Sequence, residues 1–385
     1  MSIMMRGFTR RLGRTDWVVL VIALALVLCG LVMVYSATFH LPMMGWTDVT
    51  GPTFYLVRQL RFVGLGLVAL LCCWAIDYRH YKRFAIPILV VTVASLGIMA
   101  LVGRWVQMVR GGAGGQVVLY GAIQPSEFAK IGAIVYIAIW LEANRERLRS
   151  FSMGTWPFAL LLGFMAGLIA MQPDFSTAIL LVATAGAVFF VAGADMKHFM
   201  LLLLAGALFT VISVMFLGYG SDRLEIWLAG PMSDPLDKGY QMIQALRALS
   251  SGGFMGVGLG QSGQKMYLSR YTHTDFIYSI LAEEFGFVGA VAVIALYGLW
   301  LWRGFEIAKR APDMYGRLLA VGIVSWVVFQ AILSIAVATN STPVTGTVLP
   351  FISYGGSSLV TTLASVGILL NISRAGPQGP AGGSR

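Results

Sequence analysis

The chain has 385 residues, of which 58% are hydrophobic and only 11% are charged, and its formal net charge is +10. Apolar runs of bilayer-spanning length recur along the whole chain, which excludes a soluble globular protein. No basic patch interleaved with aromatic residues occurs, so the positive charge predicts membrane topology and contact with anionic lipids rather than nucleic-acid binding.

Hydropathy in windows of about 19 residues predicts ten membrane-spanning helices and therefore an all-α polytopic fold. The predicted spans are residues 17–37, 59–77, 84–102, 125–141, 156–171, 177–193, 198–217, 277–302, 317–338 and 349–370. The first span follows several arginines, as a signal peptide does, but its apolar core is too long, so we expect an uncleaved anchor. We expect one membrane domain over residues 1–374 and a disordered cytoplasmic tail over 375–385, which is rich in Gly and Pro.

Basic residues predict the orientation of the bundle. With the N-terminus in the cytoplasm, most of the 27 Lys and Arg residues fall in cytoplasmic segments, and ten spans return the C-terminus to the same side. The longest connections, 38–58, 103–124 and 218–275, then lie outside. The last is long enough to need internal structure. Apolar positions at helical spacing after Tyr240 predict a short amphipathic helix in the outer interface. The glycines between 252 and 260 allow a close approach of the backbone to a ligand, but the favoured interpretation is a flexible connector.

The polar cluster Tyr271–Phe276 lies at the boundary of the eighth predicted span. A carboxylate in this position is costly, so Asp275 is a functional-site hypothesis. His273 is the histidine with acidic company, and an orienting partner or a plain interface residue are both open for it. The three cysteines lie within predicted spans, where a thiol is a small apolar group, and their spacing predicts no metal site.

Other polar residues lie at the expected outer ends of spans. Glu127 and Lys130 are three apart and share a helix face, so they form either a structural ion pair or part of a site. Asp174 is either a functional carboxylate or the N-cap of the following helix. Arg58 and Arg61 either snorkel or face an anionic group in the outer leaflet.

The last polar cluster is the break of Pro, Gly and Ser between Thr345 and Ser358. Such a break within an apolar segment is tolerated where the backbone is buried in protein or lines a cavity. It therefore predicts a polar cavity that opens outward, with Ser357 and Ser358 among its residues. Close helix packing through Gly355, Gly356 and these serines is the alternative.

Five motifs together resemble the SEDS family, whose members include FtsW, RodA and SpoVE. They are Gln124–Glu127, Gln172–Asp174, His273–Ile277, Glu283–Glu284 and Leu349–Ser358. The resemblance covers essentially the whole chain, and the residues around Gly258–Lys265 and Asn371–Arg374 are more like FtsW than RodA. It implies a peptidoglycan glycosyltransferase that polymerises lipid II on the outer face of the bacterial cytoplasmic membrane, in cell division.

The resemblance also implies the roles of individual residues. Asp275 is carried over as the catalytic residue, a general base on the acceptor sugar in an inverting transfer. The substrate-binding candidates are Arg58, Arg61, Glu127, Lys130, Asp174, Lys265, His273, Ser357 and Ser358. A divalent cation is compatible with the pyrophosphate leaving group, although no residue pattern identifies a site. Family members form complexes with a class B penicillin-binding protein, which is the expected partner besides lipid II and membrane lipids.

Two departures from the family pattern and two rival functions remain. The loop after the third span has Arg104–Trp105 in a rearranged context, so no residue is carried over there. The family's Pro and Glu before the His-Thr-Asp motif fall on Arg270 and Tyr271. A lipid II flippase or other transporter would need the same helices and charges, and a non-enzymatic scaffold of the division machinery would also fit.

Overall fold

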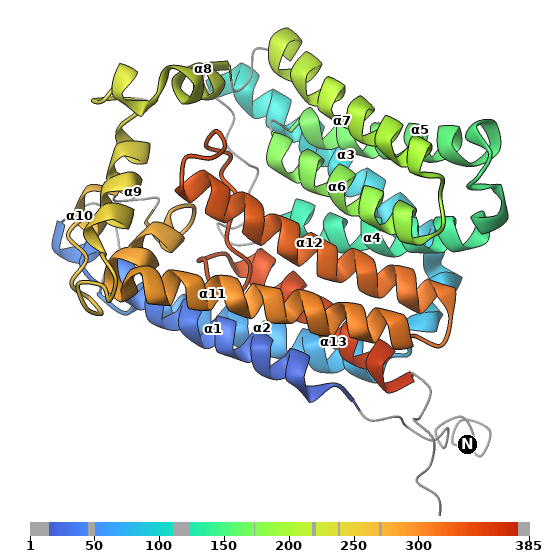
Figure 1. The fold of residues 1–385 in the computed structure, drawn as a ribbon, viewed down its shortest axis with the longest axis horizontal. Coiled ribbons are helices and arrows are strands. Elements are labelled where there is room, and N and C mark those ends of the chain that lie inside the picture. The colour runs from blue at the N-terminus through green and yellow to red at the C-terminus, as the bar shows by residue number, and fades with distance from the viewer. Residues whose placement is uncertain are drawn as a thin grey trace, which may run out of the picture.

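The computed structural model describes residues 15–44, 51–110, 124–172, 174–217, 221–237, 239–268 and 272–375, and within them the regular secondary structure is helical (Figure 1). The α-helices are α1 (Trp17–Thr38), α2 (Phe54–Ala75), α3 (Ala85–Arg110), α4 (Pro125–Ala143), α5 (Trp156–Ala170), α6 (Phe175–Val191), α7 (Met196–Leu217), α8 (Ser221–Ala229), α9 (Tyr240–Ser251), α10 (Lys265–Leu268), α11 (Ile277–Arg310), α12 (Met314–Ala338) and α13 (Gly356–Ala375). The short turns of other helix types are η1 (Leu41–Met44), η2 (Tyr78–Phe84), η3 (Arg145–Arg147), η4 (Phe151–Thr155) and η5 (Pro231–Ser233).

Each of the ten predicted spans overlaps an α-helix, α1 to α7 and α11 to α13. In the described part of the chain, seven helices are long and apolar enough to cross a membrane, and two shorter apolar helices, Ser176–Val191 and Met196–Gly206, accompany them. The remaining helix, α4, carries Glu127, Lys130 and Glu142. The prediction of an all-α polytopic membrane protein is therefore confirmed.

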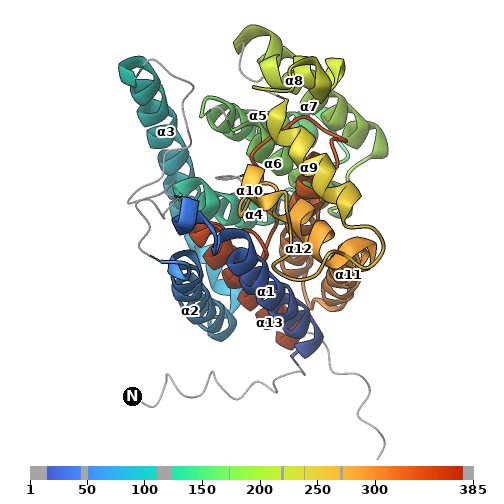
Figure 2. The same ribbon diagram turned by 90° about the vertical axis from the view of Figure 1, so that its left-hand side faces the viewer.

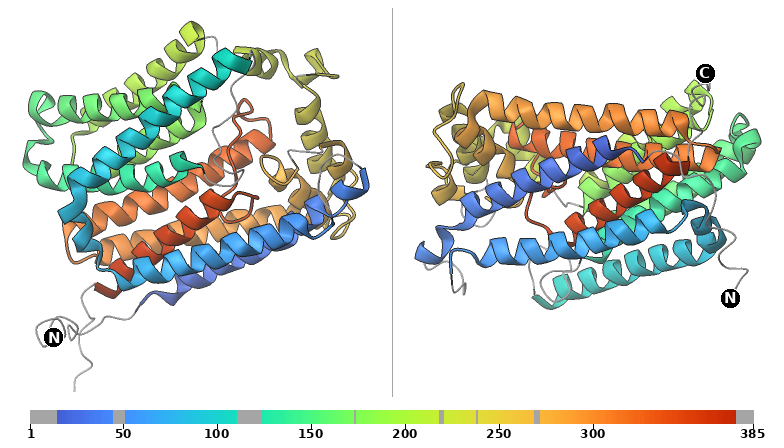
Figure 3. Two further views of the ribbon diagram at one scale, coloured as in Figure 1. Left: turned by 180° about the vertical axis from the view of Figure 1, so that it is seen from behind. Right: turned by 90° about the horizontal axis from the view of Figure 1, so that it is seen from below.

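Helices α12 and α13 form the centre of the bundle, and most of their residues are buried. Helix α2 runs beside α13, and α11 runs beside α12, as two further views show (Figure 3). Helices α2 and α13 can approach closely because Gly367 has no side chain. A Cβ added there would lie only 2.3 Å from the carbonyl oxygen of Leu70. Small residues at such contacts allow helix backbones to pack where lipid gives no hydrophobic drive.

The predicted tenth span, 349–370, is wrong at its start, because α13 begins only at Gly356. Pro350 has no N–H for a helix, and Phe351 adopts a left-handed backbone with φ +66°. The hydroxyl of Ser353 accepts the N–H of Leu349 at 2.9 Å and donates to the carbonyl of Thr274 at 2.7 Å. The break thus serves to hold the segment that contains Thr274.

Helices α8, α9 and α10 lie at the same end of the bundle, the end that faces the viewer in Figure 2, and α9 lies beside α11. Helix α9 is the predicted amphipathic helix, and one of its faces, with Met242, Ile243, Gln244, Ala245 and Ala248, is buried where α9 packs on α11. The long segment before Asp275 is therefore folded onto the bundle. The position of α9 in the outer interface of the membrane stays a prediction.

The opposite end of the bundle contains a set of ion pairs between segments distant in sequence. Arg303 at the far end of α11 pairs with Asp16 at 2.6 Å, and Lys82 pairs with Glu142 at 2.6 Å. Asp313, the N-cap of α12, accepts the N–H of Gly316 at 2.7 Å. These contacts place basic loops and their carboxylate partners together, away from Asp275.

Candidate functional site

The backbone of the segment before α11 is fixed by the break before α13. The carbonyl of His273 accepts the N–H of Tyr354 at 2.8 Å, and the carbonyl of Thr274 accepts the hydroxyl of Ser353 at 2.7 Å. The next residue but one after Thr274, Phe276, is fully buried. Asp275 is consequently held between an anchored backbone and a buried aromatic ring, at the start of a long helix.

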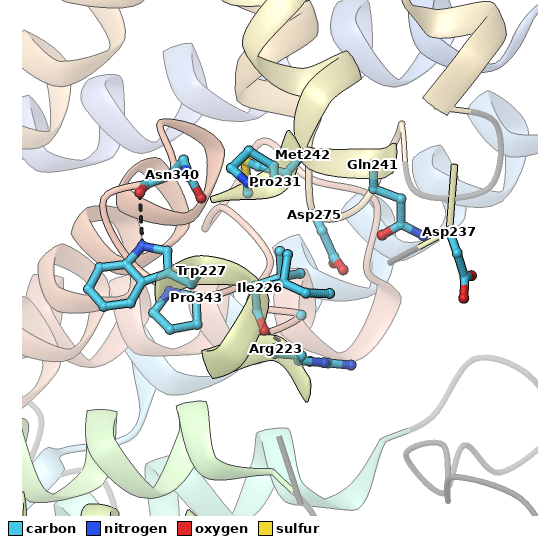
Figure 4. A pocket seen from close by; sticks show the side chains of 12 residues that line it. Arg223, Ile226, Trp227, Pro231, Asp237, Gln241, Met242, Asp275, Asn340 and Pro343 are labelled. Carbon is cyan, nitrogen blue, oxygen red and sulfur yellow. Dashed lines mark hydrogen bonds between the residues drawn. The ribbon is translucent and has the colours of Figure 1, made fainter. Parts of the chain in front are cut away.

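The side chain of Asp275 lines a cavity of about 350 Å³. Its other lining residues come from α8, from the segment between α8 and α9, from α9 and from the loop after α12. They are Arg223, Ile226, Trp227, Pro231, Asp237, Gln241, Met242, Asn340, Pro343, Val344 and Gly346. Figure 4 shows the Asp275 side chain between those of Arg223 and Gln241. The cavity is large enough for a sugar ring or a group of similar size.

Helix α8 is held over this cavity by two hydrogen bonds to the loop after α12. The guanidinium Nη1 of Arg223 donates to the carbonyl of Val344 at 3.0 Å, and the indole Nε1 of Trp227 donates to the carbonyl of Asn340 at 3.0 Å. Gly346 closes the wall beside the carboxylate with φ +74°, and a Cβ there would lie 3.8 Å from Oδ2 of Asp275. The loop therefore supports both the cavity wall and the acid.

The environment of Asp275 favours a carboxyl group that can exchange protons near neutral pH. Burial raises the pKa of Asp275 from 3.8 to about 6, while the charge of Arg223 and a hydrogen bond with Thr274 oppose this rise. Asp275 makes no ion pair within 4.0 Å to any residue that the structure describes. A carboxylate with these properties can act as a general base.

His273 is two residues before Asp275 but does not line the cavity. Its ring packs against Tyr55, at 4.7 Å between centroids, and Tyr354, at 5.2 Å. Burial, with the nearby charge of His40, lowers the pKa of His273 to about 4, so the ring is neutral at neutral pH. This arrangement fits an aromatic cluster that supports the segment, and an orienting role toward Asp275 stays a prediction.

Glu127, Lys130 and Asp174 are all buried in local interactions. Lys130 Nζ lies 2.7 Å from Glu127 Oε1 and 5.5 Å from the centroid of the Trp326 ring. Asp174 is the N-cap of α6, where it accepts the N–H of Thr177 at 3.1 Å. The structure thus contains both local arrangements that the sequence suggested, and neither group lines the cavity of Asp275.

The remaining candidates lie on three other elements. Lys265 is buried, and its Nζ lies 3.3 Å from Oε1 of Glu284, away from the lining of the cavity. Ser357 accepts the N–H of Gln124 at 2.8 Å, and Ser358 lies beside it in the first turn of α13; both are buried. Arg58, on α2, is close enough to Tyr354 that its charge opposes the rise of the tyrosine pKa to about 12 caused by burial. Arg61, one turn further along α2, is exposed. A binding role for these residues stays a prediction.

Three residues of the cavity wall were not among the candidates from the sequence: Arg223, Trp227 and Asn340. Arg223 and Trp227 are four residues apart, so they share one face of α8, and an Arg–Trp pair at helical spacing in a polar loop was the available signal. Their partners are 121 and 113 residues away, which no local pattern reveals. Among the described residues, no group of three or more His, Cys, Asp or Glu side chains is arranged to hold a metal ion.

Comparison with known proteins covers nearly the full length of the chain. The stage V sporulation protein E of Bacillus subtilis is 40% identical over 363 residues, 93% of this chain and 97% of that protein. The probable peptidoglycan glycosyltransferase FtsW of Trichlorobacter lovleyi is 37% identical over 364 residues, 94% of each chain.

Two solved structures of related proteins match the fold of this chain. The rod shape determining protein RodA of Thermus thermophilus matches with a TM-score of 0.68 at 30% identity, over 95% of this chain and 98% of that one. A chain of a peptidoglycan synthase complex, described as coordinating polymerization and crosslinking, matches with a TM-score of 0.74 at 31% identity, over 94% of this chain and 98% of that one. The family model for FtsW, RodA and SpoVE, described as cell cycle protein, matches residues 16–377, and this chain belongs to that family.

Proposed function

We propose that this protein is a peptidoglycan glycosyltransferase that polymerises lipid II on the outer face of the bacterial cytoplasmic membrane, with Asp275 as the general base. The names of its FtsW relatives support the activity. The observation that carries the residue assignment is the position of Asp275 in the wall of a cavity, with a pKa raised to about 6. A base with a pKa near the working pH transfers protons most effectively.

In the proposed reaction, Asp275 accepts the proton of the acceptor sugar's 4-hydroxyl as that oxygen bonds to C1 of the donor sugar. The bond between C1 and the pyrophosphate oxygen breaks, and undecaprenyl pyrophosphate leaves with the electron pair. An α-linked donor then yields a β-1,4 product by inversion. A single carboxylate suffices because this leaving group needs no general acid, in contrast to the paired carboxylates of glycosidases.

Cationic side chains would stabilise the charge on the departing pyrophosphate. Lys130 and Lys265 each have a buried glutamate as partner, so using either for the substrate would mean sharing its charge. Arg58 and Arg61 on α2, together with Arg223 in the cavity wall, are the candidates that lie outside these two pairs. A divalent cation could supply the same charge.

We place the Asp275 end of the bundle outside the cell. Support comes from the basic residues of the opposite end, among them Arg79, Lys82, Arg303 and Arg374, because the positive-inside rule assigns such an end to the cytoplasm. Nucleotide-linked sugars are cytoplasmic, so a transferase site outside needs a lipid-linked donor. The match to a chain of a peptidoglycan synthase complex is consistent with a class B penicillin-binding protein as partner. We propose in addition that the protein acts in cell division.

Polymerisation of purified lipid II by the purified protein tests this proposal. Asp275→Asn keeps the shape of the side chain but removes the base, and we expect a loss of about 10²- to 10⁴-fold in the polymerisation rate. Asp195→Asn, the same change at an exposed loop residue away from the cavity, is the matched control and should polymerise normally.

The same assay distinguishes the rival functions. Equal polymer from wild type and Asp275→Asn would remove Asp275 from the mechanism. No polymer from either protein, with a class B penicillin-binding protein present, would favour the flippase or the scaffold. A reconstituted flippase would then move lipid II between leaflets of a vesicle, whereas a scaffold would not.

A further inference from the structure

Helix α11 is broken at Gly286, nine residues after its start at Ile277. Gly286 has φ +68° and ψ −166°, which divides α11 into a lead helix, residues 277–285, and the long remainder, 287–310. Asp275 lies two residues before the lead helix. Every residue from Phe276 to Glu284 is at most 5% exposed. A short buried helix, joined to the span through a single left-handed residue, therefore carries the proposed base.

A strap, residues 252–265, crosses this break and satisfies its backbone. Two strap N–H groups, of Val257 and Gly258, donate to the carbonyls of Glu283 and Glu284 at 3.0 and 3.1 Å. A helix break leaves such groups without intrahelical partners, and burial would make that costly. The strap takes the place of the missing helical turn.

The contact in the reverse direction is equally specific. The N–H groups of Phe287 and Val288, beyond the break, donate to the carbonyls of Gly253 and Phe254 at 2.9 and 3.2 Å. A Cβ at Gly286 would lie 2.3 Å from the backbone nitrogen of a strap residue. Glycine is thus required at the break for the strap to reach the helix. The glycines that predicted a flexible connector instead form a fitted backbone contact.

The side chain of Glu283 holds the second half of the strap. Its carboxylate accepts the hydroxyl of Ser262, the hydroxyl of Ser251 at 3.2 Å and the N–H groups of Gly263 and Gln264 at 3.1 and 3.4 Å. Glu283 is 3% exposed. Four donors compensate this buried carboxylate, which forms no ion pair with a cation among the residues that the structure describes.

The side chain of Glu284 joins the strap to α1. It accepts the hydroxyl of Ser36 at 2.6 Å and pairs with Lys265, whose Nζ also donates to the carbonyl of Gly260 at 2.6 Å. The same ammonium group lies 4.7 Å from the centroid of the Phe39 ring. Three elements, α1, the strap and the lead helix, therefore meet at one buried ion pair.

Buried ion pairs are weak evidence for stability, because well-packed apolar residues of similar volume are often no worse. Neither glutamate lines the cavity of Asp275, so contact with the ligand there does not explain them. The two glutamates connect the lead helix to α1 and to the strap.

We infer that Glu283 and Glu284, together with Lys265, are positioning residues that set the location of Asp275 in its cavity through the lead helix and the break at Gly286. This inference rests on the proposed function of Asp275 as the base.

Steady-state kinetics on lipid II test the inference. Glu284→Gln removes the ion pair but keeps an acceptor for Ser36. A displacement of about 1 Å costs on the order of 10²-fold, so we expect kcat to fall by about that factor while KM changes less than about twofold. Glu283→Gln, which keeps an acceptor oxygen, should act in the same direction. Glu142→Gln, at the ion pair of the opposite end, is the control with a wild-type kcat.

A thiol probe at position 275 reports the location without activity. In a background with Cys29→Ala, Cys72→Ala and Cys73→Ala, Asp275→Cys reacts with a water-soluble maleimide at a rate set by exposure. Adding Glu284→Gln should change this rate by at least about threefold and leave the rate of an Asp195→Cys probe unaltered.

The two readouts separate the inference from the function on which it rests. An unchanged maleimide rate at position 275 in folded Glu284→Gln protein, or a wild-type kcat for both glutamine variants, overturns the positioning role. A changed maleimide rate in a protein whose wild type makes no polymer supports positioning and rejects the proposed function instead.

Discussion

Asp275 and Asp313 occupy equivalent places at opposite ends of the bundle, each just before a long helix, and their environments differ. Asp313 accepts hydrogen bonds from Gly316, Tyr78 and Arg79 at 2.7, 2.7 and 2.8 Å. Burial would raise the pKa of Asp313, but these donors outweigh burial and hold the pKa below 3.8. At Asp275 burial prevails and raises the pKa to about 6.

The two carboxylates differ in how many hydrogen-bond donors stabilise their charged form. The carboxylate of Asp313 accepts hydrogen bonds from three donors of the protein, so its charged form stabilises the fold. Asp275 lines a cavity, and the rise of its pKa on burial is opposed by the charge of Arg223 and a hydrogen bond with Thr274. A carboxyl group with a raised pKa in the wall of a cavity is a candidate for function, which supports the proposed role of Asp275.

Removal of Asp313 should have the largest effect on stability. Asp313→Ala deletes the N-cap of α12 and two side-chain hydrogen bonds, so we expect a loss of about 2 to 4 kcal/mol. The measurement is the melting temperature in detergent, which should fall by several degrees. Because the folded pKa is lowered, this contribution is present at neutral pH and is lost as the pH falls below 3.8. An unchanged melting temperature at pH 7.5 would show that Asp313 is not satisfied as described.

The same kind of substitution at Asp275 should act with the opposite sign. Since its folded pKa is raised, ionisation of Asp275 costs stability above about pH 6, and the cost disappears below 3.8, where the folded and unfolded states are both protonated. Asp275→Asn removes the charge and should stabilise the protein by at most about 3 kcal/mol at pH 7.5. Thermal unfolding of variant and wild type at pH 7.5 and near pH 4 measures the difference. A gain of equal size at both values would refute this origin.

Activity should follow the ionisation of Asp275. Below its pKa the base is protonated, so kcat/KM for lipid II should fall about tenfold per pH unit below about pH 6 and level off above it. Initial rates over a range of pH, with the melting temperature as a check on folding, provide the measurement. A flat profile through pH 6 in folded protein would contradict the assignment of the base.

The bundle could be predicted from the sequence because long apolar runs determine the spans without reference to their neighbours. Local spacing likewise suggested the Glu127–Lys130 pair and the N-cap at Asp174. The start of α13 was missed because the hydrophobic window extended through Pro350, whose segment is irregular in order to hold Thr274. Hydropathy measures apolar content and does not register a backbone that is buried in protein.

The candidate site was predictable only in part. Asp275 is a carboxylate at the boundary of an apolar span, and this local pattern was enough to select it as a candidate. The cavity depends on α8, which is held by contacts from Arg223 and Trp227 to residues more than a hundred positions away. The role of the strap could not be predicted either, because it depends on the contact between its backbone and Gly286. Contacts between residues so far apart cannot be predicted from the pattern of any single segment.

Arg223 offers the smallest and most selective change. Its positive charge lowers the pKa of Asp275, so Arg223→Gln should raise that pKa and move the rise of kcat/KM to higher pH. Near pH 6 the rate should fall by less than about tenfold, while the plateau at high pH stays close to wild type. Arg223→Lys keeps a charge and should leave the profile nearer to wild type.

Arg223 also holds α8 through the carbonyl of Val344, and the two roles give different profiles. If the guanidinium acts on Asp275 by charge, substitution shifts the profile along the pH axis. If it acts only by fixing the cavity wall, Arg223→Gln and Arg223→Lys both lower the plateau and leave the midpoint in place. A shared loss of plateau would therefore assign Arg223 to the structural group of contacts exemplified by Asp313, and a shift of the midpoint would assign it to the reactive group with Asp275.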